Sequence, residues 1–334
     1  MNKDFLRKIY TTNIVSSFVN LLGKPWKGNG SILMYHRVLP DEKISEDLDV
    51  GLAVLTSNFE KQINLLKTNY NIVPIDELIN NLKSKRKEKF LLSITFDDGY
   101  KDNLNFALPI LEHYKIPATI YVTTRFLDTD VWMWWYELKE IINQKDYLKF
   151  NYKEHNYYYE LKNYRQKIQA FKNLRKLFLN LRVNEQLELL EIVTENKKRK
   201  NYSKICLDSK DLKTLDKNSL ITIGAHTHTH TNLKILNKDE AINDICKCTK
   251  ILENLLDHKV KHFAYPYGGL DQADIREYDI IKNLSFSSAV TDRVYPIKDD
   301  NLFSLPRIGV GKNANEKEIN NHLTGFYNLA VKFM

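Results

Sequence analysis

Cysteine, long apolar runs and a secretory core are all scarce or missing in this chain. The three cysteines, Cys206, Cys246 and Cys248, form an odd, scattered set, which excludes a disulfide framework. No apolar run is long enough to cross a bilayer. Polar residues interrupt the apolar positions near the N-terminus, so we expect no cleaved signal peptide. We therefore predict a cytoplasmic protein, at most peripheral at the inner membrane face.

The N-terminal segment, residues 1–28, is predicted to be an amphipathic helical segment. Its apolar residues recur at near-helical spacing: Phe5, Leu6, Ile9, Ile14, Phe18 and Leu22. Such a helix could contact a membrane surface or pack on the rest of the chain, and packing is slightly favoured.

Residues 29–334 read as alternating strands and helices. The chain has 334 residues and 43% hydrophobic content, enough for one large domain with an insertion. Strands are expected at 31–35, 72–75, 91–96, 118–122, 220–223, 262–265 and 285–290. Helices are expected at 57–69, 103–114 and 238–256. This order predicts a parallel α/β sheet, with the site formed by loops at the strand C-termini.

The alternation breaks between residues 124 and 218, a stretch too long for a loop, so an inserted subdomain is expected there. Helical spacing of Ile168, Phe171, Leu174, Phe178 and Leu181, and a second helix at 185–193, make it mainly helical. Residues 142–200 contain 14 Lys and Arg against 7 Asp and Glu, so most of the chain's net charge of +8 lies here.

This basic insertion, rich in tyrosine, has several interpretations. It could bind nucleic acid by phosphate contacts and stacking, a phosphorylated sugar, or a lipid diphosphate at an anionic membrane surface. The simplest alternative is a solvated helical face. We expect no nucleic-acid partner, and keep peripheral membrane contact through this insertion as an option.

Two distant segments contain residues suited to metal-assisted hydrolysis. Asp97 and Asp98 follow the buried strand 91–96, and His226, His228 and His230 follow the strand 220–223. Adjacent carboxylates need compensation by a cation or hydrogen bonds, and histidines four residues apart can converge on one ion. The alternatives are a plain Asp-Gly turn and a solvated loop.

These segments resemble motifs of the polysaccharide deacetylase family, the carbohydrate esterases of family 4 that share the NodB homology domain. The matching segments are Thr95-Phe96-Asp97-Asp98-Gly99, His226-Thr227-His228-Thr229-His230, Phe263-Ala264-Tyr265-Pro266-Tyr267-Gly268 and Leu305-Pro306-Arg307-Ile308-Gly309. Tyr35-His36 is similar to a segment of a permuted subgroup. The resemblance implies a distorted, incomplete (β/α) barrel with the mainly helical insertion.

The resemblance also implies roles for individual residues. Asp97 would be the general base, and the backbone N–H of Tyr267 would stabilise the oxyanion. Asp98, His226 and His230 would hold a divalent metal, with zinc expected first and cobalt, nickel or manganese as alternatives. His228 would be turned away from the metal, and Thr227 would orient the site by hydrogen bonding.

The chain departs from the family pattern in two places. Ala264 stands where the family commonly has an Arg that pairs with the catalytic Asp, and Arg307 is the candidate replacement. The usual C-terminal His motif is absent, and His322 does not match it. His36 is therefore the candidate general acid, with a structural core histidine as the alternative.

Aromatic residues near the expected site are candidates for substrate contact. An indole face can cover the apolar side of a sugar, but the same residues could pack the insertion against the barrel. The candidates are Trp132, Trp134, Trp135, Tyr100 and Tyr265.

Taken together, the sequence predicts a metal-dependent hydrolase that removes the N-acetyl group from an acetamido sugar of a bacterial surface glycan or lipid-linked precursor. A glycan O-acetyl esterase and an inactive glycan-binding relative are the alternatives.

Overall fold

The computed structural model describes residues 27–43, 52–84, 89–195, 197–297, 301–311 and 314–325. Most of the predicted N-terminal helical segment, 1–28, lies outside these residues, so its membrane contact stays a prediction. Among the described helices, none combines the length and apolar character that a membrane span requires.

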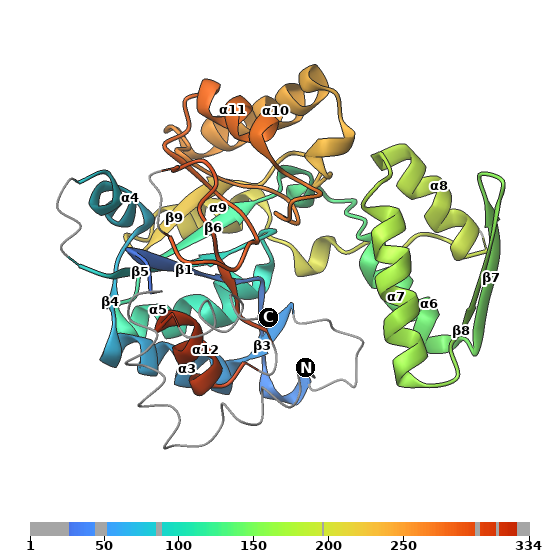
Figure 1. Ribbon diagram of the computed structural model, residues 1–334, viewed down its shortest axis with the longest axis horizontal. Helices are drawn as coiled ribbons and strands as arrows, with labels where there is room; N and C mark the ends of the chain where they lie inside the picture. Colours follow the sequence, from blue (N-terminus) through green and yellow to red (C-terminus); the bar gives the residue numbers. More distant parts are fainter. Residues whose placement is uncertain are drawn as a thin grey trace.

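A parallel sheet forms the larger part of the molecule (Figure 1). Its strand order is β11-β10-β9-β6-β5-β1-β12, with β4 also pairing with β5. The strands of this sheet are β1 (Gly30–Tyr35), β4 (Asn71–Ile72), β5 (Leu91–Phe96), β6 (Ala118–Val122), β9 (Ile221–Ala225), β10 (His262–Ala264), β11 (Ser288–Val290) and β12 (Ile308–Gly309). A short parallel pair, β2 (Arg37–Leu39) and β3 (Ala53–Leu55), follows β1.

Helices cover the sheet and hold the connections between strands. The described α-helices are α3 (Thr56–Asn69), α4 (Ile75–Lys83), α5 (Leu108–Tyr114), α6 (Trp134–Gln144), α7 (Tyr164–Phe178), α8 (Val183–Val193), α9 (Ser209–Asp216), α10 (Lys238–Leu256), α11 (Ile275–Asn283) and α12 (Glu316–Leu323). A π-helical turn, Asn103–Ala107, leads into α5. Short 3-10 turns are η2 (Asp41–Lys43), η4 (Thr124–Leu127), η5 (Ser203–Ile205) and η6 (Leu233–Ile235).

The sheet curls into an incomplete (β/α) barrel, as predicted. The end strand β12 pairs with β1, and a parallel bridge joins Val290 of β11 to Leu305, three residues before β12. Strands β5 and β6 and helix α10 have the bounds expected from sequence. All six residues of β5 are buried, which explains why four of them are apolar and why Ser93 and Thr95 donate hydrogen bonds to backbone carbonyls.

Two predicted strands each lack three of their expected residues, and the strand expected at 262–265 ends one residue early, at Ala264. The predicted strand 72–75 ends at Ile72, because Ile75 begins α4 and Asp76 and Glu77 in its first turn favour a helix N-terminus. The predicted strand 285–290 begins only at Ser288, because Ser285 has φ of 63°, in the left-handed region, which does not fit an extended strand.

The insertion contains a β-hairpin that the sequence interpretation missed. Strands β7 (Tyr147–Tyr152) and β8 (His155–Glu160) pair antiparallel and lie at the outer side of α6, α7 and α8 (Figure 1). Leu148, Phe150 and Tyr152 alternate inward with exposed residues along β7, so this segment follows the period of a strand and not of a helix.

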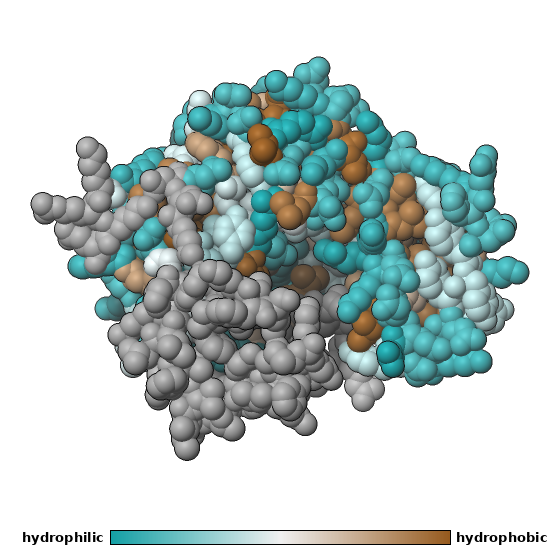
Figure 2. Space-filling view, viewed as in Figure 1, coloured by the Kyte–Doolittle hydropathy of each residue, from teal (hydrophilic) through white to brown (hydrophobic). Residues whose placement is uncertain are grey.

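The barrel and the insertion have separate hydrophobic cores. The insertion core is rich in aromatic residues and runs from Tyr100 and Phe126 to Cys206. Helix α9 falls within the predicted insertion, 124–218, but its Leu212 and Leu215 pack in the barrel core. On the face seen in Figure 2 the insertion is hydrophilic at its outer edge, with hydrophobic areas nearer the barrel.

Candidate active site

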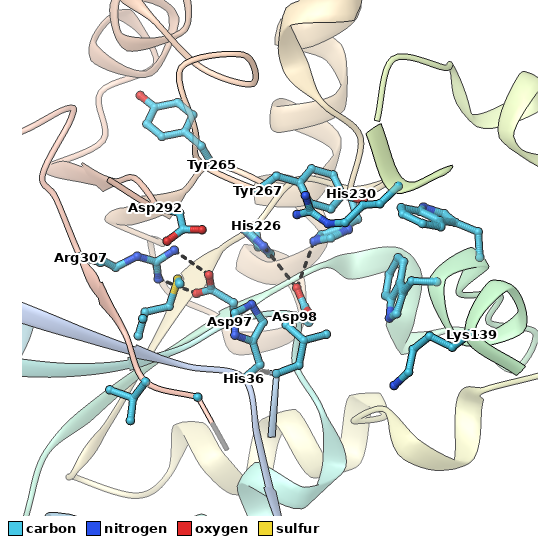
Figure 3. A pocket seen from close by; sticks show the side chains of 18 of the residues that line it. His36, Asp97, Asp98, Lys139, His226, His230, Tyr265, Tyr267, Asp292 and Arg307 are labelled. Atoms are coloured by element: carbon cyan, nitrogen blue, oxygen red, sulfur yellow. Dashed lines mark hydrogen bonds and ion pairs between the residues drawn. The ribbon is translucent and has the colours of Figure 1, made fainter. Parts of the chain in front are cut away.

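Loops at the C-terminal ends of the strands bring the predicted residues to one end of the barrel. His36 follows β1, Asp97 and Asp98 follow β5, and His226 follows β9. Parallel strands deliver such residues to a common edge, which is why positions far apart in sequence meet here (Figure 3).

Asp98, His226 and His230 form one buried cluster. The Asp98 Oδ1 atom lies 3.0 Å from His230 Nε2 and 3.4 Å from His226 Nε2. One ligand atom from each residue lies within 4.8 Å of the others. Burial tends to raise the pKa of Asp98, but the neighbouring imidazoles hold it well below its usual range.

The hydrogen bonds of this cluster fit a cation between the three side chains. His226 Nδ1 lies 2.8 Å from the carbonyl oxygen of Ala264, which can only accept, so Nδ1 carries the proton. The Nε2 atom of neutral His226 then carries no proton and can only accept a hydrogen bond. It faces Asp98 Oδ1, which is also an acceptor, is buried and has no hydrogen-bond donor among the described residues. Separations of 3.0 and 3.4 Å suit ligands that each lie about 2.0–2.2 Å from a tetrahedral ion.

The backbone around these ligands has unusual dihedral angles. Asp98, Thr227 and His230 have φ of 76°, 63° and 56°, all in the left-handed region. Thr227 Oγ1 accepts a hydrogen bond of 3.0 Å from the backbone N–H of His230, the orienting contact expected for this residue. His228 lies outside the cluster, and its Nδ1 is 2.9 Å from Thr124 Oγ1.

Asp97 and Arg307 form a buried, two-pronged ion pair. Arg307 donates from Nη1 to Asp97 Oδ1 at 2.7 Å and from Nη2 to Oδ2 at 2.6 Å. It also donates to the carbonyl of Thr291 and the hydroxyl of Thr95. Burial alone would raise the pKa of Asp97, but the guanidinium lowers it below its usual value. The cation missing at Ala264 is thus supplied by Arg307.

His36 lines the same cavity as Asp97 and Asp98. Asn103 donates to the His36 carbonyl at 2.8 Å, and Asp102 accepts from the backbone N–H of Val38 at 2.9 Å. The next residue, Arg37, pairs with Asp102 at 2.8 Å. These bonds fix the backbone at His36 and at the two residues that follow it.

Tyr267 and Gly268 form a tight turn after β10. Tyr267 has φ of 62°, and its backbone N–H has no hydrogen-bond partner among the described residues. Gly268 has φ of 51°, and a Cβ there would lie 2.3 Å from the backbone nitrogen of Asp292. Only glycine fits this close approach.

The cavity at this end of the barrel has a volume of about 550 Å³. It is lined by barrel loops on one side and by α6 and α7 of the insertion on the other. The insertion contributes Trp134, Trp135, Lys139, Phe171, Lys172 and Arg175.

The predicted aromatic contacts separate into two groups. Trp134, Trp135 and Tyr265 line the cavity. Trp132 and Tyr100 are buried in the insertion core and do not line it, which corrects their assignment to substrate contact. Arg125 lies over the Trp132 ring, and the Tyr100 hydroxyl lies 3.3 Å from that of Tyr136, so both have packing roles.

Asp292 is a cavity residue that the sequence interpretation missed. It lies two residues after β11, in the same position relative to its strand as Asp98 to β5. Burial among the surrounding loops raises its pKa, while Arg307 and His36 act to lower it. Asking which polar residue follows each predicted strand would have found it.

Comparison with protein families gives a match to the polysaccharide deacetylase model over residues 84–177 and 184–280, more than half of the chain. The chain belongs to the polysaccharide deacetylase family. A protein of Bacillus subtilis (strain 168), YxkH, which carries the name of the same family, is 31% identical over 93 residues. That alignment covers 27% of this chain and spans only 30% of the length of YxkH.

Solved structures of polysaccharide deacetylases have the same fold. The deacetylase PplD of Streptococcus pyogenes superposes with a TM-score of 0.57 at 19% identity, over 88% of this chain and 97% of PplD. IcaB from Ammonifex degensii superposes with a TM-score of 0.58 at 17% identity, over 89% and 97% of the two chains. At these identities the likeness describes the incomplete barrel of this polysaccharide deacetylase and not its substrate.

Proposed function

We propose that this polysaccharide deacetylase is a metal-dependent N-deacetylase of an acetamido sugar in a glycan or glycolipid precursor. The observation that carries the proposal is the adjacent pair Asp97 and Asp98, whose two carboxylates have different partners. Asp97 is held by Arg307, and Asp98 faces His226 and His230. One carboxylate is thereby available for proton transfer and the other for a metal.

A divalent ion held by Asp98, His226 and His230 would supply Lewis-acid polarisation of the attacking water and the amide carbonyl. The chain's own residues would do the rest. Asp97, kept ionised by Arg307, would accept the proton of the water as its oxygen attacks the carbonyl carbon. The backbone N–H of Tyr267, which has no partner among the described residues, would donate to the oxyanion that forms.

The C–N bond then breaks, and the amine needs a proton to leave. His36 lines the cavity with Asp97 and is the candidate donor, which gives acetate and a free amino sugar as products. Trp134 and Trp135 would hold the sugar from the insertion wall, since an indole face can cover the apolar side of a sugar. Tyr265 lines the cavity from the barrel side, but its ring points away from Asp97 and Asp98 (Figure 3) and its hydroxyl donates to the carbonyl of Phe303 at 2.9 Å.

Removal of an O-acetyl group is the second candidate, because it would use the same water activation with less need for His36. A binding protein without turnover is the third. The bidentate Asp97–Arg307 pair argues against lost turnover, since it keeps the base ionised despite Ala264.

Acetate release from N-acetylglucosamine oligomers and from an O-acetylated xylan would test the three candidates. N-deacetylation predicts acetate from the first substrate, lost on treatment with a chelator and restored by zinc. Acetate from xylan alone would favour the esterase, and oligomer binding without acetate from either would favour the binding protein.

The assignment of His226 and His230 as metal ligands can be tested with His228, which lies between them, as the control. His226→Ala and His230→Ala should lower metal occupancy and turnover together, and His228→Ala should retain both. Full metal retention in the first two variants, measured by elemental analysis after dialysis, would reject the assignment.

The cytoplasmic location also remains a proposal, to be tested by fractionation of cells.

A further inference from the structure

The two walls of the cavity carry opposite charges. Its carboxylates, Asp97, Asp98 and Asp292, all come from barrel loops. The cations Lys139, Lys172 and Arg175 come from α6 and α7 of the insertion. We propose that this basic wall of the insertion binds a phosphate group on the substrate, so that the substrate is a phosphorylated N-acetyl sugar. This inference rests on the proposed function.

Helix geometry directs the basic wall at the cavity. Lys172 and Arg175 are three residues apart on α7, and Phe171, which also lines the cavity, is four residues before Arg175, so all three lie on one face. Lys139 is only 4% exposed and lies across the pocket from Arg307 (Figure 3). Arg175 lies over the ring of Tyr267, beside the proposed oxyanion donor.

Five other cations of the insertion have carboxylate partners. These pairs are Lys145–Glu195, Lys153–Glu185, Arg182–Glu240, Arg199–Asp130 and Lys200–Glu140. Lys172 and Arg175 have no ion pair within the part of the chain that the structure describes, and the free charge of the wall comes from these two and not from Lys139. Arg307, the further cation of the cavity, is already bonded to Asp97. The basic wall therefore keeps positive charge available to a ligand beside the metal cluster.

Phosphate fits Lys172 and Arg175 better than a carboxylate does. A phosphate monoester carries about −1.5 to −2 charge at pH 7 and three acceptor oxygens, and a guanidinium can bind two of those oxygens at once. A carboxylate would neutralise one of these two cations and leave the other unbalanced beside the cavity. The phosphate could be a substituent of a polymer or part of a diphosphate that links the sugar to a lipid.

Binding of two sugars that differ only in charge tests the proposal. Isothermal titration of the full chain with N-acetylglucosamine 1-phosphate and with methyl N-acetylglucosaminide should give at least about tenfold tighter binding of the first. Lys172→Gln and Arg175→Gln should each reduce this preference by roughly tenfold, the size of a charge-assisted hydrogen bond. Lys176→Gln, on the same helix but outside the cavity, should leave it unchanged.

Several outcomes would overturn the proposal. These are equal affinity for the two sugars, an equal effect of Lys176→Gln, or a preference that disappears when the metal is removed, which would assign the phosphate to the ion. Equal gain from N-acetylmuramic acid, which carries a carboxylate, would reject phosphate as the ligand class.

The measurement also separates this proposal from the proposed function. Binding needs no turnover, so a preserved preference without acetate release would reject the deacetylase and keep the phosphate site. Acetate release from both sugars with equal KM would support the deacetylase and reject the phosphate site. A prenyl-diphosphate-linked N-acetylglucosamine in micelles would distinguish the sources of the phosphate. Binding tighter than that of N-acetylglucosamine 1-phosphate would support the phosphate site and identify a lipid source. Equal affinity for the two would support the site with a polymer or soluble source.

Discussion

The barrel wall and the insertion wall of the cavity differ in how their charged side chains are held. On the barrel wall Asp97, Asp98, His226 and Arg307 are buried and face one another at 2.6 to 3.4 Å. On the insertion wall Lys172 and Arg175 are exposed side chains of one helix that line the cavity without an ion pair among the described residues. The barrel wall thus has the rigid order that proton transfer and metal binding need, and the insertion wall has the freedom suited to recognition.

This difference predicts separate consequences for mutation. Removing one member of a buried charged pair leaves its partner in a low-dielectric site, which costs stability as well as activity. Removing an exposed cation changes the field at the cavity with little cost to folding. The variants below are ordered from the largest expected effect to the smallest.

Asp97→Asn should have the largest effect, on turnover. The amide keeps the shape of the carboxylate but cannot accept the proton of water, so kcat should fall by about 10² to 10⁴. Metal occupancy should persist, because Asp98 and the two histidines are unchanged. The preference for the phosphorylated sugar should also persist, because the basic wall is intact. Near-normal acetate release would eliminate Asp97 as the base.

Arg307→Met should have the next largest effect, on stability. Asp97 would lose its bidentate partner while still buried, and the free energy of unfolding should fall by roughly 3–5 kcal/mol in urea titrations. Arg175→Met is the matched control from the insertion wall. This variant should change the free energy of unfolding by less than about 0.5 kcal/mol. The double variant Asp97→Asn/Arg307→Met should recover part of the loss. Equal effects of the two single variants would show that the walls do not differ.

His36→Gln should separate protonation of the leaving amine from activation of the attacking water. An amine leaves poorly without a proton, whereas a phenolate hardly needs one. Amide hydrolysis should therefore fall by roughly a hundredfold while hydrolysis of an activated aryl acetate is largely retained. His322→Gln should alter neither, since His322 does not line this cavity. Equal losses on both substrates would assign His36 a structural role instead.

The barrel wall was largely predictable from sequence, and the insertion wall was not. The apolar strands before Asp97 and His226 are continuous and buried, and parallel strands bring their C-terminal loops together whatever lies between them. The partner of Asp97 was harder, because Arg307 precedes β12 and its side chain crosses the barrel interior from there. That contact depends on sheet order, which a single sequence does not display.

The insertion shows what sequence periodicity can and cannot predict. The helical spacing from Ile168 to Phe178 predicted α7, but not that Lys172 and Arg175 would face the barrel, since this depends on docking of the two cores. The hairpin β7–β8 had the alternation of a strand in Leu148, Phe150 and Tyr152, and was missed because helical patterns flank it.

Docking of the insertion on the barrel includes one fully buried side chain that can be removed singly. Asn232, in the loop after His226 and His230, donates from Nδ2 to the carbonyl of Leu179 at 2.9 Å and of Asp271 at 3.3 Å. Leu179 belongs to the insertion core and follows α7 directly, so this bond connects the basic wall to the barrel.

Asn232→Ala should have the smallest of these effects, and one specific to the junction. The buried Leu179 carbonyl would lose its donor, and the free energy of unfolding should fall by about 1–3 kcal/mol. Asn180→Ala is the matched control, because Asn180 also donates from Nδ2 to a carbonyl, that of Lys176 at 2.8 Å, but is exposed. Its lost bond can be replaced by water, so its unfolding should change little. Limited proteolysis of Asn232→Ala should cut between the insertion and the barrel sooner than in the parent chain, while Asn180→Ala should cut at the parent rate. Equal stability losses in the two variants would show that the cores hold the insertion in place without this bond.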